Sequence, residues 1–145
     1  MKDLLYLKDE QIKDFIQLLF YAYRETFSDP KEVLSKKFFG PAHLRSLNLI
    51  ERHPGISLGE LMFKLKITKQ SLNRVLKDLI KLDVIFFNKD QQDTRVKHIF
   101  LSDKGEKIFK EIFFLQKKRI SNAFLKSSSE EVLNFDNVLK RIINE

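Results

Sequence analysis

The sequence of 145 residues contains no cysteine and no tryptophan. Without cysteine the chain has no disulfide, no thiolate metal site and no cysteine-based redox sensor, which is compatible with the cytoplasm, where we expect the protein to act. Metal binding is not expected either. The three histidines, His43, His53 and His98, lack metal-ligand spacing, and we interpret each as a surface or helix-end residue.

Long apolar runs are missing as well. The longest near the N-terminus, residues 15–23, is interrupted by Gln17 and falls far short of the roughly 18 residues that a membrane-spanning helix needs. We therefore expect a soluble protein. The chain has only four glycines and three prolines, no repeat and no Gly/Ser linker, and 43% of its residues are apolar. This composition predicts one compact unit.

No nucleotide-binding glycine motif occurs, so no cofactor is expected. One motif does suggest an enzyme: residues 55–59 form a literal G-x-S-x-G, and Asp83 and His98 follow in the order of a hydrolase triad. That nucleophile elbow requires a large parallel sheet, for which this chain has no room. Ser57 is better explained as a helix cap, paired with Glu60 in an S-x-x-E box. We therefore predict that the protein is not an enzyme.

The formal net charge is +7, and it is unevenly distributed. The net charge is +1 in residues 1–56 and +2 in residues 106–145, whereas residues 57–105 carry ten basic against six acidic residues, a net +4. A basic excess concentrated in one segment indicates an anionic partner more strongly than its size alone would.

Helical periodicity accounts for most of the chain. Apolar residues recur at helical spacing over residues 12–27, and Asp29-Pro30 ends that helix. A second helix begins at Gly40-Pro41 and ends at His53-Pro54-Gly55, while Ser102 and Ser128 are placed to cap two helices near the C-terminus. The terminal helices are amphipathic and need a surface to cover them.

A helix-turn-helix pattern lies between them. Residues 58–64 form a short helix, residues 65–67 a turn, and Thr68 caps a helix over residues 69–82. One face of this last helix is apolar, with Leu72, Val75, Leu76, Leu79 and Leu82. The opposite face is polar and cationic, with Lys69, Gln70, Asn73, Arg74, Lys77 and Lys81, and Asp78 is its single acid. These side chains suit DNA bases and phosphates.

A charged hairpin follows. Residues 84–87 and 96–101 predict two strands, joined by a polar loop over residues 88–95. The predicted fold is therefore mainly α, within the α+β class: a winged helix-turn-helix with a two-stranded wing and additional N- and C-terminal helices.

The wing resembles a known family. Asp93-Thr94-Arg95, followed after five residues by Leu101-Ser102 and then Gly105, is similar to the D-x-R and L-[ST]-x-x-G signature of the MarR family of winged-helix transcriptional regulators. The resemblance covers nearly the whole chain and is firmest over residues 40–105, and residues 67–76 resemble its PetP-like branch. Asp83 stands where most members have glycine, in a left-handed position that aspartate tolerates less well.

The resemblance implies one MarR-like unit over residues 1–145, with DNA binding by residues 40–105 and dimerisation by residues 1–39 and 106–145. In a symmetric homodimer, the helix at 69–82 enters the major groove and the wing, residues 88–97, reaches the minor groove of a pseudo-palindromic operator. Half-sites lie about 10 base pairs apart. The amphipathic terminal helices independently favour a dimer, because pairing would bury them.

We predict eleven DNA-binding residues. The resemblance makes Arg95 the minor-groove arginine, oriented by Asp93; a surface ion pair without DNA is the alternative. Base contacts are expected from Gln70, Asn73 and Arg74, with phosphate contacts alone as the alternative. The remaining residues are expected to contact phosphates or to line the wing: Thr68, Lys69, Ser71, Lys77, Lys89 and Lys97.

Two further questions stay open at this point. Some members of the family release DNA on binding small phenolic or lipophilic acids. A pocket for such an effector would draw on the phenylalanines Phe20, Phe38, Phe39, Phe113 and Phe114, although such a set more often forms part of the core. The alternative function is a winged-helix module that binds protein or RNA without operator specificity.

Overall fold

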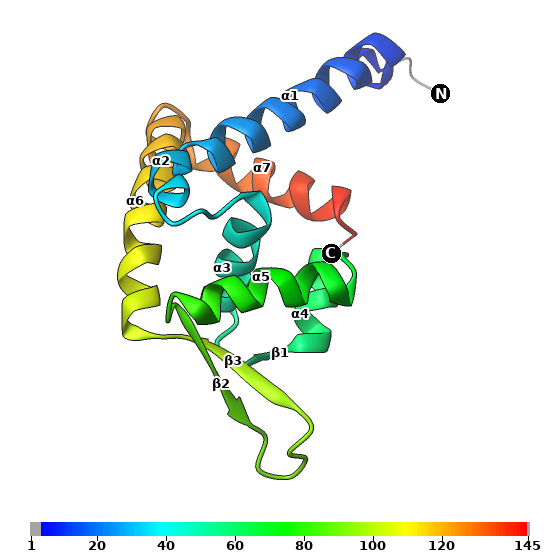
Figure 1. Cartoon of the computed structure of the whole chain (residues 1–145). Helices are drawn as coiled ribbons and strands as arrows, with labels where there is room; N and C mark the ends of the chain where they lie inside the picture. The colour runs from blue at the N-terminus through cyan, green and yellow to red at the C-terminus, as the bar shows by residue number, and fades with distance from the viewer. Residues whose placement is uncertain (1–3, 145) are drawn as a thin grey trace.

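The computed structural model describes residues 4–144; residues 1–3 and 145, which belong to the two predicted terminal regions, lie outside the described residues. In chain order the elements are η1 (Leu5–Leu7), α1 (Asp9–Ser28), α2 (Lys31–Ser35), α3 (Pro41–Arg52), β1 (Ile56–Ser57), α4 (Leu58–Leu65), α5 (Lys69–Lys81), β2 (Ile85–Lys89), β3 (Lys97–Leu101), α6 (Asp103–Leu125) and α7 (Ser129–Ile142). Figure 1 shows the β2–β3 hairpin projecting from the helices, with α1 extending away at the opposite end. The predicted winged helix-turn-helix is confirmed.

The core is built on the apolar stripe of α5. Leu72, Val75, Leu76 and Leu79 are buried, as the spacing predicts, and Leu82 is half-buried. They belong to one cluster with side chains from the neighbouring elements: Leu44, Leu47 and Ile50 of α3, Leu61 of α4, Ile99 of β3, and Ile108 and Ile112 of α6. Elements that precede the wing in the sequence, α3 and α4, and the helix that follows it, α6, therefore both pack around α5.

The predicted serine and threonine caps begin the helices. Ser57 accepts a hydrogen bond from the Glu60 amide at 3.2 Å, and Ser102 accepts one from the Gly105 amide at 2.9 Å. The box at Ser128 is complete, with both reciprocal hydrogen bonds. The box at Ser57 shows only the serine half, and Ser57 also belongs to β1. Ser57 thus serves as a helix cap and not as an elbow nucleophile.

The sheet has one strand more than predicted. Its order is β1-β3-β2, all antiparallel, with Ile56 opposite Ile99 and Ile85 opposite Leu101. Two-residue β1 is too short to show alternation, so the sequence offered no pattern for it. The hairpin loop spans residues 90–96, and α5 ends at Lys81, one residue before the predicted end.

The junction between α5 and α6 explains two residues of the wing signature. Asp83 is left-handed, with φ of 61°, as expected for the position after α5. The Ser102 amide then donates to the carbonyl of Val84 at 2.9 Å. A Cβ on Gly105 would collide with that same carbonyl oxygen, so only glycine lets α6 approach this closely.

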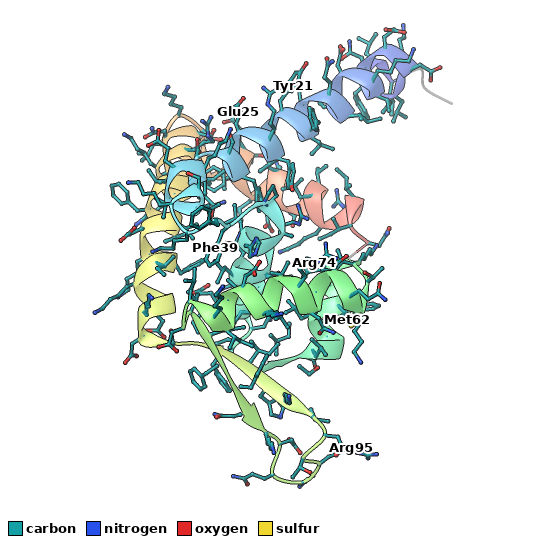
Figure 2. The ribbon with its side chains drawn as sticks, in the orientation of Figure 1. Tyr21, Glu25, Phe39, Met62, Arg74 and Arg95 are labelled. Atoms are coloured by element: carbon teal, nitrogen blue, oxygen red, sulfur yellow. The ribbon has the colours of Figure 1, made fainter. Side chains whose placement is uncertain are left out.

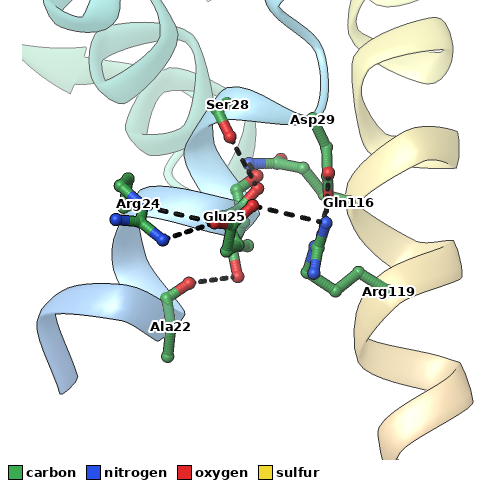
Figure 3. A network of polar contacts seen from close by, with 8 residues as sticks. Ala22, Arg24, Glu25, Ser28, Asp29, Gln116 and Arg119 are labelled. Carbon is green, nitrogen blue, oxygen red and sulfur yellow. Dashed lines mark hydrogen bonds and ion pairs between the residues drawn. The ribbon is translucent and has the colours of Figure 1, made fainter. Parts of the chain in front are cut away.

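The C-terminal end of α1 is fastened to α6 by polar contacts (Figure 3). Arg119 donates two hydrogen bonds to Asp29, and its guanidinium lies 3.8 Å from Glu25. Buried Gln116 donates to the carbonyl of Thr26 at 3.2 Å. By contrast, α1 and α7 contain no buried residue. No helix within residues 4–144 is long and apolar enough to cross a membrane.

Candidate nucleic-acid interface

The face of α5 opposite the core is exposed and cationic. Thr68, at the cap, and six side chains along the first three turns are all exposed: Lys69, Gln70, Ser71, Asn73, Arg74 and Lys77. Arg74 is labelled on this helix in Figure 2. The burial of the apolar stripe fixes the rotation of α5, so the polar side chains cannot turn inward without exposing the core.

The single acid of α5 is occupied by a contact to α3. The Gly40 amide donates to Nδ1 of His43 at 3.0 Å, so the ring proton lies on Nε2, which is 2.9 Å from a carboxylate oxygen of Asp78. Phe39 stacks on the imidazole, with ring centroids 4.8 Å apart. The His43 side chain is only 13% exposed. This contact ties the last turn of α5 to the start of α3 and engages the carboxylate of Asp78.

The start of α5 is organised by two hydroxyl groups. Thr68 Oγ1 accepts from the Ser71 amide at 3.1 Å and donates to Ser71 Oγ at 3.0 Å. The Ser71 hydroxyl therefore keeps its own hydrogen for another acceptor, whereas the Thr68 hydroxyl is used within the cap. The first turn of a helix also presents free amides and a partial positive charge, which favour a phosphate.

The wing tip holds Arg95 outward. Its side chain is 89% exposed, and it donates through Nε and Nη2 to the carboxylate of Asp93 at 3.0 and 3.2 Å. The Arg95 amide donates to the same carboxylate at 3.1 Å. These hydrogen bonds lower the pKa of Asp93 below its ordinary value. Asp93 therefore holds the Arg95 guanidinium within the wing loop, and Figure 2 shows Arg95 at the far end of the wing.

A groove of about 460 Å³ joins α5 to the wing. Its polar lining comes from Asn73 and Lys77 of α5 and from Arg95 and Lys97 of the wing. Lys97 also lies over the ring of Phe87, with Nζ 5.5 Å from the ring centroid. Four of the predicted DNA-binding residues, distant in sequence, thus share one groove. Lys69, Gln70, Arg74 and Lys89 do not line it; they lie along the exposed helix and at the end of β2.

His98 is a residue whose role the sequence did not indicate. It lies in the central strand β3, is half-buried, and has ring nitrogens 2.9 Å from the Gly55 carbonyl and 2.9 Å from an Asp90 carboxylate oxygen. Interpreting it as a surface or helix-end residue was wrong. Asp90 precedes it by eight residues across the wing loop, a spacing that matches no motif. Asp83, the third member of the apparent triad, is not hydrogen-bonded to it.

Comparison with known proteins identifies the chain. The MarR family model matches residues 39–95, which include α3 to α5 and most of the wing. The HTH-type transcriptional regulator PetP of Rhodobacter capsulatus is 35% identical over 141 residues, covering 97% of this chain and 85% of PetP. The chain belongs to the MarR family. It is a winged-helix transcriptional regulator, and the expected resemblance to PetP is confirmed.

Solved structures of MarR proteins share its fold. A MarR transcriptional regulator from Methanosarcina mazei Go1 has a TM-score of 0.74 at 20% identity, covering 91% of this chain and 95% of its own. Staphylococcus aureus MarR, solved in complex with salicylate and kanamycin, has a TM-score of 0.73 at 23% identity, covering 92% and 91%. The MarR relatives are regulators and not enzymes, which agrees with the predicted absence of an enzymatic activity.

Proposed function

We propose that this MarR-family protein binds an operator in the cytoplasm as a homodimer. Helix α5, predicted as residues 69–82, lies in the major groove, and wing residues 88–97 reach the adjacent minor groove. The single observation that carries this proposal is the groove shared by Asn73 and Lys77 of α5 with Arg95 and Lys97 of the wing. One duplex meeting both elements must place its sugar-phosphate backbone between them.

The residue roles follow from chemistry and exposure. Gln70, Asn73 and Arg74 project from α5 and have the amide and guanidinium groups that pair with base edges. Arg95, held by Asp93, suits the negative potential of a narrow minor groove. Phosphate contacts are assigned to the other predicted residues: Thr68, Lys69, Ser71, Lys77, Lys89 and Lys97.

The terminal helices support the dimer. Helices α1 and α7 expose large apolar side chains along most of their length: Ile12, Phe15, Ile16 and Leu19 of α1, and Leu133, Phe135, Val138 and Ile142 of α7. Apolar surface of this extent is rarely left in water, and a symmetric partner would cover it. We therefore assign dimerisation to residues 1–39 and 106–145, as far as the structure describes them.

A pocket between α1, α2 and α3 supports effector binding. It has a volume of about 370 Å³ and is lined by apolar groups that include Phe20, Tyr23 and Phe39, together with the cations Arg24 and Lys31. This lining fits a small lipophilic acid, and S. aureus MarR was solved with salicylate. The other predicted phenylalanines do not line this pocket: Phe38, Phe113 and Phe114.

Selection of bound fragments from a random duplex library tests the function. We expect an inverted repeat whose half-site centres lie about 10 base pairs apart, bound by two copies of the chain in sedimentation analysis. Arg95→Ala should weaken binding to that duplex by about 1–3 kcal/mol. Enrichment of no DNA sequence would favour the alternative, a module that binds protein or RNA.

Salicylate, added to the selected complex, should release the wild-type protein more readily than Arg24→Gln.

A further inference from the structure

His98 joins the wing to the body of the winged helix through both ring nitrogens. Nδ1 lies 2.9 Å from the carbonyl oxygen of Gly55, in the turn before β1, and Nε2 lies 2.9 Å from Oδ1 of Asp90, at the start of the wing loop. A carbonyl oxygen and an ionised carboxylate can only accept hydrogen bonds. Both ring nitrogens must therefore donate, which a neutral imidazole cannot do.

The charges around the ring favour this doubly protonated form. Asp90 from the wing loop and Glu60 from α4 act on it, whereas its cross-strand neighbours, Ser57 on β1 and Asn88 on β2, are uncharged. The hydrogen bond to Asp90, and then that to Gly55, raise the pKa of His98 above its ordinary value of 6.5. The same contact to His98 is the main cause that lowers the pKa of Asp90.

The hydrogen bonds continue from His98 to the tip of the wing. Oδ2 of Asp90 accepts from the amides of Gln92 and Asp93, at 3.0 and 2.9 Å. The carboxylate of Asp93 in turn accepts three hydrogen bonds from Arg95. Arg95 is thus connected to the Gly55 carbonyl through Asp93, Asp90 and His98, and every link except the one between His98 and Gly55 lies within the β2–β3 hairpin.

We propose that His98, as an imidazolium, is a positioning residue that fixes the wing loop through Asp90 and thereby presents Arg95 to DNA. The inference rests on the DNA binding proposed above. It adds to that function a residue that need not touch DNA, and it makes the order of the wing depend on one proton.

The sign of the pH dependence follows from the direction of the pKa shift. A group with a raised pKa in the folded state contributes fully below its unfolded value of about 6.5, and its contribution is lost as the pH rises through the raised pKa. The wing is therefore ordered on the acidic side of this window. DNA affinity should fall as the pH rises through the His98 pKa.

The test combines two measurements on the full chain. Nitrogen-15 NMR of the histidine rings in the free protein gives the protonation of His98 and its pKa without reference to DNA. Fluorescence anisotropy with the selected duplex then gives affinity between pH 6 and 9, at constant salt. The variants are His98→Gln, which cannot bridge both acceptors, His98→Lys, which keeps a charge but not the bridge, and Asp90→Asn. His53→Gln, at an exposed histidine, is the control.

We expect both ring nitrogens to be protonated at pH 7. His98→Gln should bind the duplex roughly five- to tenfold more weakly, with an affinity that no longer depends on pH through this group. This loss should be smaller than the one expected for Arg95→Ala. His98→Lys should remain equally weak. Asp90→Asn should shift the NMR pKa and the affinity midpoint downward together. His53→Gln should match the wild type in both.

Three results would overturn the positioning role: a singly protonated ring at pH 7, wild-type affinity in His98→Lys, or the same loss from His98→Gln in an Arg95→Ala background. If the wild type binds no duplex, the proposed function fails and this inference fails with it. A wild type that binds DNA with a neutral His98 overturns this inference alone, so the two failures are distinguishable.

Discussion

The winged region, residues 40–105, and the terminal helices α1, α6 and α7 use the same kinds of apolar residue with different outcomes. Leu61, Leu72 and Leu79 are fully buried in the winged region, whereas Leu125 and Leu133, on α6 and α7, are 84% and 64% exposed. Both regions show helical amphipathicity, so the pattern specifies the helix but not what covers it. Within a single chain, α6 contributes Ile108 and Ile112 to the core, whereas α1 and α7 contain no buried residue. This difference is the reason that a second copy is proposed to cover α1 and α7.

The largest effect is expected from placing charge on that uncovered surface. Ile16→Glu on α1 combined with Leu133→Glu on α7 puts carboxylates where two copies are proposed to meet. Desolvating like charges costs several kcal/mol, so the dimer dissociation constant should rise by at least about 100-fold. Sedimentation equilibrium measures it.

Phe63 supplies the matched control for this pair. It lies on α4 and is 79% exposed, yet it belongs to the winged region. Phe63→Glu should leave the protein dimeric. If the double variant stays dimeric, or if Phe63→Glu dissociates the dimer, then α1 and α7 do not form the dimer surface.

The next largest effect is expected from truncating a leucine in the core. Leu79 of α5 is fully buried, so Leu79→Ala should cost about 2–5 kcal/mol of the free energy of unfolding, from lost burial and a cavity. In the monomer made by the charge substitutions, Ile142→Ala should change that free energy by less than about 0.5 kcal/mol. Urea unfolding of both variants measures the difference, and equal costs would contradict the contrast in burial.

A pair of glycines tests close packing inside the winged region. Gly105→Ala places a Cβ against the Val84 carbonyl and should cost about 1–3 kcal/mol of the free energy of unfolding. Gly59, on α4, has nothing within 4 Å of such a Cβ, so Gly59→Ala should stabilise the helix by about 0.5–1 kcal/mol. The melting temperature should fall for Gly105→Ala and rise for Gly59→Ala. A change in the same direction for both variants would exclude the proposed collision.

Local chemistry explains which parts of this fold were predictable. The caps at Thr68 and Ser102 satisfy amides three residues away, and the apolar stripe of α5 repeats within four residues, so a short stretch of sequence is enough to predict both. The wing and its Asp93–Arg95 pair are equally local. These features place the cationic face of α5 and the hairpin arginine without knowledge of any distant contact.

The features that the sequence did not indicate join distant segments. His43 contacts Asp78 across 35 positions, and His98 contacts the Gly55 carbonyl across 43. A lone histidine carries no periodicity, and its partners here are a backbone carbonyl and two carboxylates that also suit a solvated surface. Strand β1, two residues long, exists only because β3 pairs with it. Such contacts follow from the folded topology and not from residue spacing.

Charge gives the smallest and most local test of the comparison. Lys77 lines the groove between α5 and the wing, whereas Lys126 follows the last residue of α6. Each change to alanine lowers the net charge equally. Lys77→Ala should flatten the dependence of log affinity on log salt by roughly one unit for each copy of the chain, because each copy of the proposed dimer loses one phosphate contact. At 1.5 Å per residue, the 23 residues of α6 place its C-terminal end about 35 Å from the wing, far beyond the screening length of about 8 Å in physiological salt. Lys126→Ala should therefore leave the slope unchanged. If both variants flatten the salt dependence equally, net charge governs binding, and the position of the cations in the winged region has no effect.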